Sequence, residues 1–171
     1  MNTHKLSILK QNARKLRFVT GSFKRFVEFY DEHKLNECDE SGKVMEVILA
    51  FILGSIQANL SQYGIPFWID MSQDNDDGQI DFMINHAAIQ LKFNFADEDL
   101  EAIQGSLRFR NIRVLGIKKY KPGIDYDVLD TVIDILRLAG LNEDEIERET
   151  DEDPAFDLAY SLWTWYCNGI Q

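Results

Sequence analysis

Residues on either side of Asn85-His86 alternate between apolar and polar, and three of the polar ones are suited to metal binding or to the activation of water. The segments 79–84 and 87–95 predict two strands joined by a two-residue turn. Antiparallel pairing places Asp81 opposite Gln90, and alternation puts Asp81, Gln90 and Lys92 on one face. Cross-strand neighbours are about 5 Å apart at Cβ, so a carboxylate, an amide and an ammonium converge there. The alternative is an ordinary amphipathic hairpin whose polar face meets water.

Glu46 lies in the most apolar helical segment of the chain, residues 43–64. Apolar residues surround it on nearly every side of the helix, so we expect its carboxylate to be at least partly buried. Such burial is unfavourable unless a cation or a hydrogen-bond donor compensates it. A metal ion is one compensating group. The other interpretation is a first-turn Glu that the helix dipole favours and that pairs with Lys43.

These residues resemble the active-site pattern of the PD-(D/E)xK nucleases: Glu in a helix, Asp on a strand, and an acid or Gln two residues before Lys on the next strand. The matching segments are D-G-Q-I-D, which ends at Asp81, and I-Q-L-K from Ile89 to Lys92. The Mrr-like restriction endonucleases, in which Gln replaces the second acid, are the most similar members. The resemblance covers about residues 43–120, and it departs from the pattern because no Pro precedes the Asp.

The resemblance implies an α/β fold with a restriction-endonuclease-like core, in which helices flank a central mixed four-stranded sheet, plus N-terminal and C-terminal helices. It implies a Mg²⁺ or Mn²⁺ site whose ligands are Glu46, Asp81, the Gln90 side-chain oxygen and the Leu91 backbone carbonyl. Glu46, Asp81, Gln90 and Lys92 would then be the catalytic residues, with Lys92 orienting the attacking water or stabilising charge on the phosphate. The implied reaction is hydrolysis of DNA phosphodiester bonds in restriction, repair or defence, by a homodimer if both strands are cut.

Hydrophobic periodicity predicts the remaining elements of one domain spanning residues 1–171. Its parts are an N-terminal helical part at 1–35, the nuclease-like core at 43–121 and a C-terminal helical part at 125–171. Within the core we expect a strand near residues 66–72, the hairpin, a helix at 97–109 and a strand at 113–120. A helix at 126–140 ends at Gly140, and an aromatic helix at 157–166 is expected to supply core packing or a subunit interface.

Thirteen of the eighteen cationic residues fall in two segments that contain no acid, residues 5–25 and 108–121. The second segment follows the predicted active site, so it is a candidate for phosphate contacts. Its members are Arg108, Arg110, Arg113, Lys118, Lys119 and Lys121. The alternative is a solvated helix end and strand edge. The first segment predicts either a phosphate-contacting arm or a charged face packed on the core, and Gln104 is a weaker candidate for the site.

The opposite charge dominates residues 143–157, where nine acids accompany only Arg148, and the chain as a whole has a net charge of −11. This segment is predicted to be a solvated loop remote from DNA. It also supports a second function from a different class: a non-catalytic acidic protein of nuclease-like fold that binds a basic or nucleic-acid-processing partner, as inhibitors, immunity proteins and DNA mimics do.

The composition indicates a cytoplasmic protein that contacts no membrane. The longest apolar run, Val47–Leu53, is shorter than the roughly 20 residues of a membrane-spanning helix, and the N-terminus has no signal-peptide pattern. The two cysteines, Cys38 and Cys167, are far apart and have no zinc-ligand spacing around them.

Overall fold

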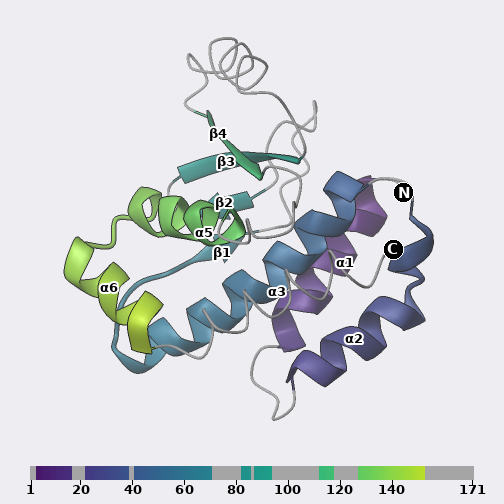
Figure 1. The fold of residues 1–171 in the computed structure, drawn as a ribbon, viewed down its shortest axis with the longest axis horizontal. Coiled ribbons are helices and arrows are strands. Elements are labelled where there is room, and N and C mark those ends of the chain that lie inside the picture. The colour runs from purple at the N-terminus through teal and green to yellow at the C-terminus, as the bar shows by residue number, and fades with distance from the viewer. Residues whose placement is uncertain are drawn as a thin grey trace.

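The computed structural model describes residues 3–16, 22–38, 41–70, 82–85, 87–93, 112–117 and 127–152, and Figure 1 labels their elements. The helices are α1 (Thr3–Lys15), α2 (Ser22–Glu32), the short 3₁₀ helix η2 (Leu35–Glu37), α3 (Ser41–Gln62), α5 (Asp127–Leu138) and α6 (Glu143–Glu152). The strands are β1 (Ile69–Asp70), β2 (Phe82–Ile84), β3 (Ala87–Phe93) and β4 (Ile112–Ile117).

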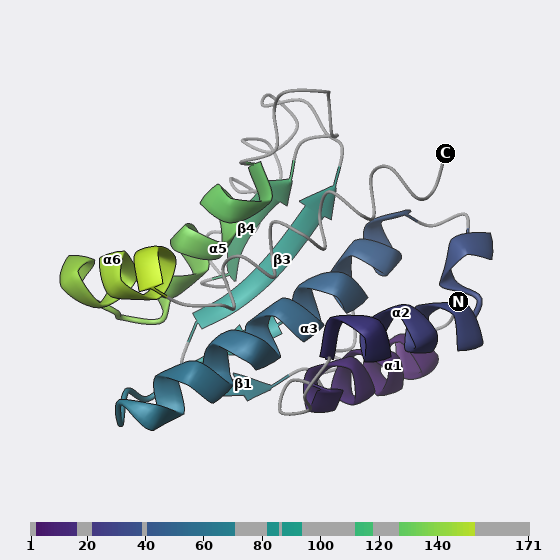
Figure 2. The same cartoon turned by 60° about the horizontal axis from the view of Figure 1, so that its bottom comes forward.

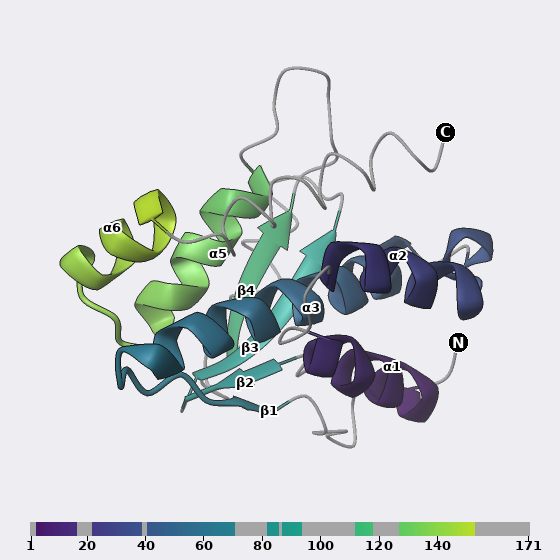
Figure 3. The ribbon, with the colours of Figure 1, turned by 90° about the horizontal axis from the view of Figure 1, so that it is seen from below.

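Helix α3 forms the centre of the molecule, because it is apolar all round and every residue from Val44 to Ile56 is buried. Helix α1 packs along it, α2 stacks Phe26 on Phe51 with ring centroids 4.8 Å apart, and β3 contacts it from the sheet. Figures 2 and 3 show α1 and α2 at one end of α3 and α6 at the other. By length and composition Gly42–Gln62 could span a membrane, but 72% of its most apolar window is buried inside the structure, as in a core helix.

The sheet has the order β1-β2-β3-β4, with β1, β2 and β3 antiparallel and β4 parallel to β3. Phe82 pairs with Ile89, Met83 with Ala88 and Ile84 with Ala87, so the predicted hairpin and its register are confirmed for these residues. Asn85 has φ 51°, a left-handed conformation that Asn tolerates better than most residues and that tight hairpin turns require.

The predicted fold class, an α/β core built on a central four-stranded sheet, is wrong for the described residues. Helices account for most of them, and only β2, β3 and β4 have three residues or more, since β1 pairs with β2 through Ile69 and Asp70 alone. Among the described residues, the apolar helix α3 contributes more buried side chains than the four strands together. The predicted helices at 97–109 and 157–166 lie outside the described residues, and the division into one domain stays a prediction.

The prediction of a loop in the acidic segment is also wrong for Glu143–Glu152, which form the helix α6. Asn142 begins it: the Glu145 N–H donates to Asn142 Oδ1 at 2.8 Å, and the Asn142 N–H donates to Glu145 Oε1 at 2.9 Å. This reciprocal capping box satisfies two backbone donors that would otherwise lack partners. The acids of its first turn also interact favourably with the helix dipole.

The buried phenol of Tyr30 on α2 is expected to make the fold less stable at high pH. Its burial, reinforced by the charges of Asp31 and Cys38, raises the pKa of Tyr30 to about 12 from the ordinary 10.0. The folded chain therefore keeps this proton in a pH range where the unfolded chain has lost it. We expect stability to be intact below about pH 10 and to fall by roughly 2–3 kcal/mol as the pH rises towards 12.

Urea unfolding at several alkaline pH values measures this loss. A Tyr30→Phe variant has no phenol to titrate and should lose clearly less stability over the same range. An equal loss in both proteins would show that another group is responsible.

Candidate functional site

Glu46 is buried, as the sequence predicts, with only 8% of the residue exposed. Its compensating cation comes from α1: Lys10 Nζ donates to Glu46 Oε1 at 3.1 Å, and Lys10 is itself 5% exposed. The same ammonium lies 4.8 Å from the centroid of the Phe82 ring. At this position Lys10 supplies the positive charge that the metal-site hypothesis assigned to Mg²⁺.

Lys10 was missed by sequence reasoning, although a signal for it exists. It lies four residues after Leu6 and three before Ala13, on the apolar stripe that α1 turns towards α3. A lysine at the centre of such a stripe either extends its amine to solvent or meets a buried acid. Its partner Glu46 lies on α3, 36 positions further along the chain, so spacing within α1 could not identify it.

The two faces of the hairpin separate Glu46 from Gln90. Phe82 and Ile89 are paired and buried, and Phe82 contacts the Lys10 ammonium, so their face is the one towards Glu46. Gln90 follows Ile89 in a regular strand and therefore projects from the opposite face. One metal ion cannot bind both side chains in this arrangement.

Gln90 has an unusual environment of its own. Its side-chain Oε1 is buried, and no donor among the described residues reaches it. Buried polar atoms are nearly always hydrogen-bonded, so an orphaned carbonyl oxygen calls for a missing donor or cation. This is the oxygen that the sequence predicts to be a metal ligand.

The other predicted site residues are described in part or not at all. Leu91 and Lys92 are described by their backbone alone, in parallel pairs with Leu115 and Gly116 of β4, and Arg113 is paired with Ile89. The remaining predicted residues lie outside the described part of the chain: Asp81, Gln104, Arg108, Arg110, Lys118, Lys119 and Lys121. Within the described ranges, no group of three or more His, Cys, Asp or Glu residues could hold a metal ion.

Arg14 is a second cation of α1 whose side chain turns towards the core. Its Nη1 donates to the backbone carbonyl of Ile69 on β1 at 2.8 Å, and Gly54 of α3 lies directly against its backbone. Two of the cations in the basic N-terminal segment therefore pack on the core, which was one of the two alternatives for that segment. Lys5, Lys15, Lys24 and Arg25 are exposed.

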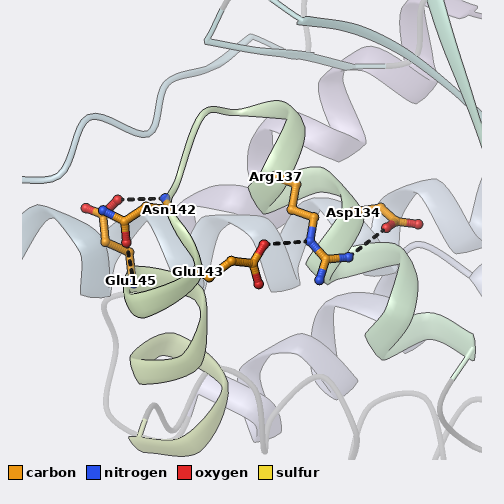
Figure 4. A network of polar contacts seen from close by, with 5 residues as sticks. All are labelled: Asp134, Arg137, Asn142, Glu143 and Glu145. Atoms are coloured by element: carbon orange, nitrogen blue, oxygen red, sulfur yellow. Dashed lines mark hydrogen bonds and ion pairs between the residues drawn. The ribbon is translucent and has the colours of Figure 1, made fainter.

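Acidic side chains, by contrast, lie on the outside of α5 and α6. Asp134, Glu143, Asp144 and Glu147 are all exposed. Figure 4 shows Arg137 between two of them: its Nε donates to Glu143 Oε1 at 3.1 Å, and its Nη1 lies 3.7 Å from Asp134 Oδ1. These contacts hold the pKa of Arg137 above its ordinary value, through the hydrogen bond to Glu143 first and its charge second.

No protein-family model, curated protein or solved structure matches this chain. The resemblance to PD-(D/E)xK nucleases therefore stays a prediction, and function has to be argued from the site.

Proposed function

We propose that this chain acts by binding a basic protein partner, and not by hydrolysing DNA. The observation that carries the proposal is the buried ion pair between Lys10 and Glu46. A carboxylate that an ammonium already neutralises has little reason to bind a divalent cation, because the cation would leave Lys10 buried beside a second positive charge. The ion pair therefore gives an explanation of the buried Glu46 that needs no metal ion.

The distribution of charge supports the same proposal. Lys10 and Arg14 face the interior, whereas four acids of α5 and α6 face solvent, in a chain whose net charge is −11. These acids are Asp134, Glu143, Asp144 and Glu147. Such a surface repels the phosphates of nucleic acids and attracts cationic proteins at a distance of about one Debye length.

Two assays on the intact chain test the proposal. In a plasmid-nicking assay with Mg²⁺ or Mn²⁺, we expect no more cleavage from the chain than from an Asp81→Ala variant or an EDTA control. In a binding assay at about 0.15 M salt, we expect measurable affinity for polylysine, whereas polyglutamate should not bind. Absence of any binding to polylysine would overturn the proposal.

One observation favours DNA hydrolysis as a second candidate. The register confirmed at Phe82 and Ile89 agrees with the predicted pairing that would bring Asp81 opposite Gln90, and the Gln90 oxygen is buried without a described donor. A Mg²⁺ or Mn²⁺ ion held by Asp81 and Gln90, with Lys92 beside it, would satisfy that oxygen without Glu46. Metal-dependent nicking that Asp81→Ala abolishes and Glu46→Gln preserves would select this candidate over the first.

A further inference from the structure

The segment between α3 and β1 exposes large apolar side chains. Tyr63 is 51% exposed and Trp68 is 72% exposed, and Pro66 between them is exposed as well. Ile65 and Phe67 pack on the core from the other side of the segment. We call Tyr63, Pro66 and Trp68 the aromatic strip. An exposed Trp offers a large contact area at low entropic cost, and such residues are enriched in binding surfaces.

Hydrogen bonds hold the aromatic strip in one conformation. The Trp68 N–H donates to Asn85 Oδ1 at 2.7 Å, and the Trp68 carbonyl accepts from the Asn85 N–H at 2.7 Å. Asn85 Nδ2 donates to the carbonyls of Pro66 at 3.2 Å and Ala139 at 2.6 Å. The strip is therefore fixed between the hairpin turn and the end of α5, which lowers the ordering cost of binding.

The acidic helix α6 contacts the Tyr63 end of the aromatic strip. The Arg148 guanidinium of α6 lies 4.1 Å from the Tyr63 ring centroid, and Ala139, which shares the Asn85 donor with Pro66, comes three residues before the α6 cap at Asn142. The exposed Asp144 lies one helical turn before Arg148, and the exposed Glu147 directly precedes it, so α6 carries acidic side chains next to the residue that contacts Tyr63.

We propose that the aromatic strip and α6 together form a docking surface for an arginine-rich, extended segment of a partner protein. This inference rests on the proposed function and names the surface that performs it. Arginine fits both halves of the surface, because its planar guanidinium stacks on Trp and forms bidentate hydrogen bonds with carboxylates. The contact between Arg148 and Tyr63 is an instance of the same recognition within the chain.

The test measures binding of a labelled deca-arginine peptide to the full chain by fluorescence anisotropy at about 0.15 M salt. We expect Trp68→Ala to weaken binding about 5- to 30-fold, which is the range of a cation–π contact at a partly desolvated site. Asp144→Asn combined with Glu147→Gln should weaken it too. The matched control is Glu28→Gln combined with Glu32→Gln on α2, which removes the same charge at the other end of the molecule and should have a clearly smaller effect.

Other outcomes would contradict the docking surface, the proposed function or the kind of partner. If deca-arginine binds but Trp68→Ala binds it equally well, or if the α6 and α2 variants weaken it equally, the docking surface is wrong and the general affinity for basic partners stands. If neither deca-arginine nor polylysine binds, the proposed function itself is wrong. Stronger binding of single-stranded polyuridylate than of the peptide would replace the protein partner with a nucleic acid.

Discussion

Replacing Lys10 with Met is expected to lower the free energy of unfolding by about 3–5 kcal/mol, because it leaves the Glu46 carboxylate buried without its cation. Domains of this size are stable by only about 5–15 kcal/mol, so the effect should be large in any urea titration followed by circular dichroism. Lys15→Met on the same helix, at an exposed position, is the matched control and should change stability by less than about 0.5 kcal/mol.

The double variant Lys10→Met with Glu46→Leu separates the charge effect from packing. Replacing both members of a buried pair with apolar residues is often neutral or stabilising, so the double variant should recover most of the stability lost by Lys10→Met. This variant also keeps the experiment decisive if Lys10→Met does not fold. A double variant as unstable as the single one would contradict the ion pair described above.

Gly54→Ala is expected to destabilise the chain by about 1–3 kcal/mol, opposite in sign to the usual effect of this change within a helix. A Cβ added at Gly54 would lie 2.6 Å from the Arg14 carbonyl oxygen and 3.1 Å from its Cα. Both atoms belong to the α1 backbone, so the two helices would have to separate. Chemical denaturation compares the variant with Gln62→Ala at the exposed end of α3, which should be nearly neutral.

A second variant locates the clash. The Arg14 Cγ lies 2.9 Å from the added Cβ, but the contacts with the Arg14 backbone remain when the side chain is shortened. Combining Gly54→Ala with Arg14→Ala should therefore not restore stability. Full recovery in that double variant would mean that the side chain, and not the close approach of the helices, sets the cost.

The local parts of the fold could be predicted from the sequence because their causes are local. Asn85 marks the turn of the hairpin, and alternation around it fixes the register that pairs Phe82 with Ile89. The burial of Glu46 follows from the apolar residues that surround it on α3. Each of these predictions depends on residues that are neighbours in the chain.

The parts that could not be predicted depend on contacts between distant segments. The cation for Glu46 comes from α1, thirty-six positions away, so no spacing rule identifies it. The predicted site also assumed that a helix residue and one face of a hairpin meet, whereas the buried Phe82 shows that the opposite face turns towards Glu46. Residues 143–157 were predicted to form a solvated loop because of their acidity, but the capping box at Asn142 and the buried Ile146 stabilise helix α6.

The hydrogen bond from Arg14 to Ile69 has a consequence for the solubility of the chain. β1 is the edge of the described sheet, and because the Trp68 carbonyl pairs with Asn85, the next carbonyl, that of Ile69, points outwards. An unprotected sheet edge recruits strands from other molecules, and α1 occupies this one with a guanidinium. Loosening α1 would uncover a template for intermolecular β-pairing, so variants that detach this helix should self-associate before they are fully unfolded.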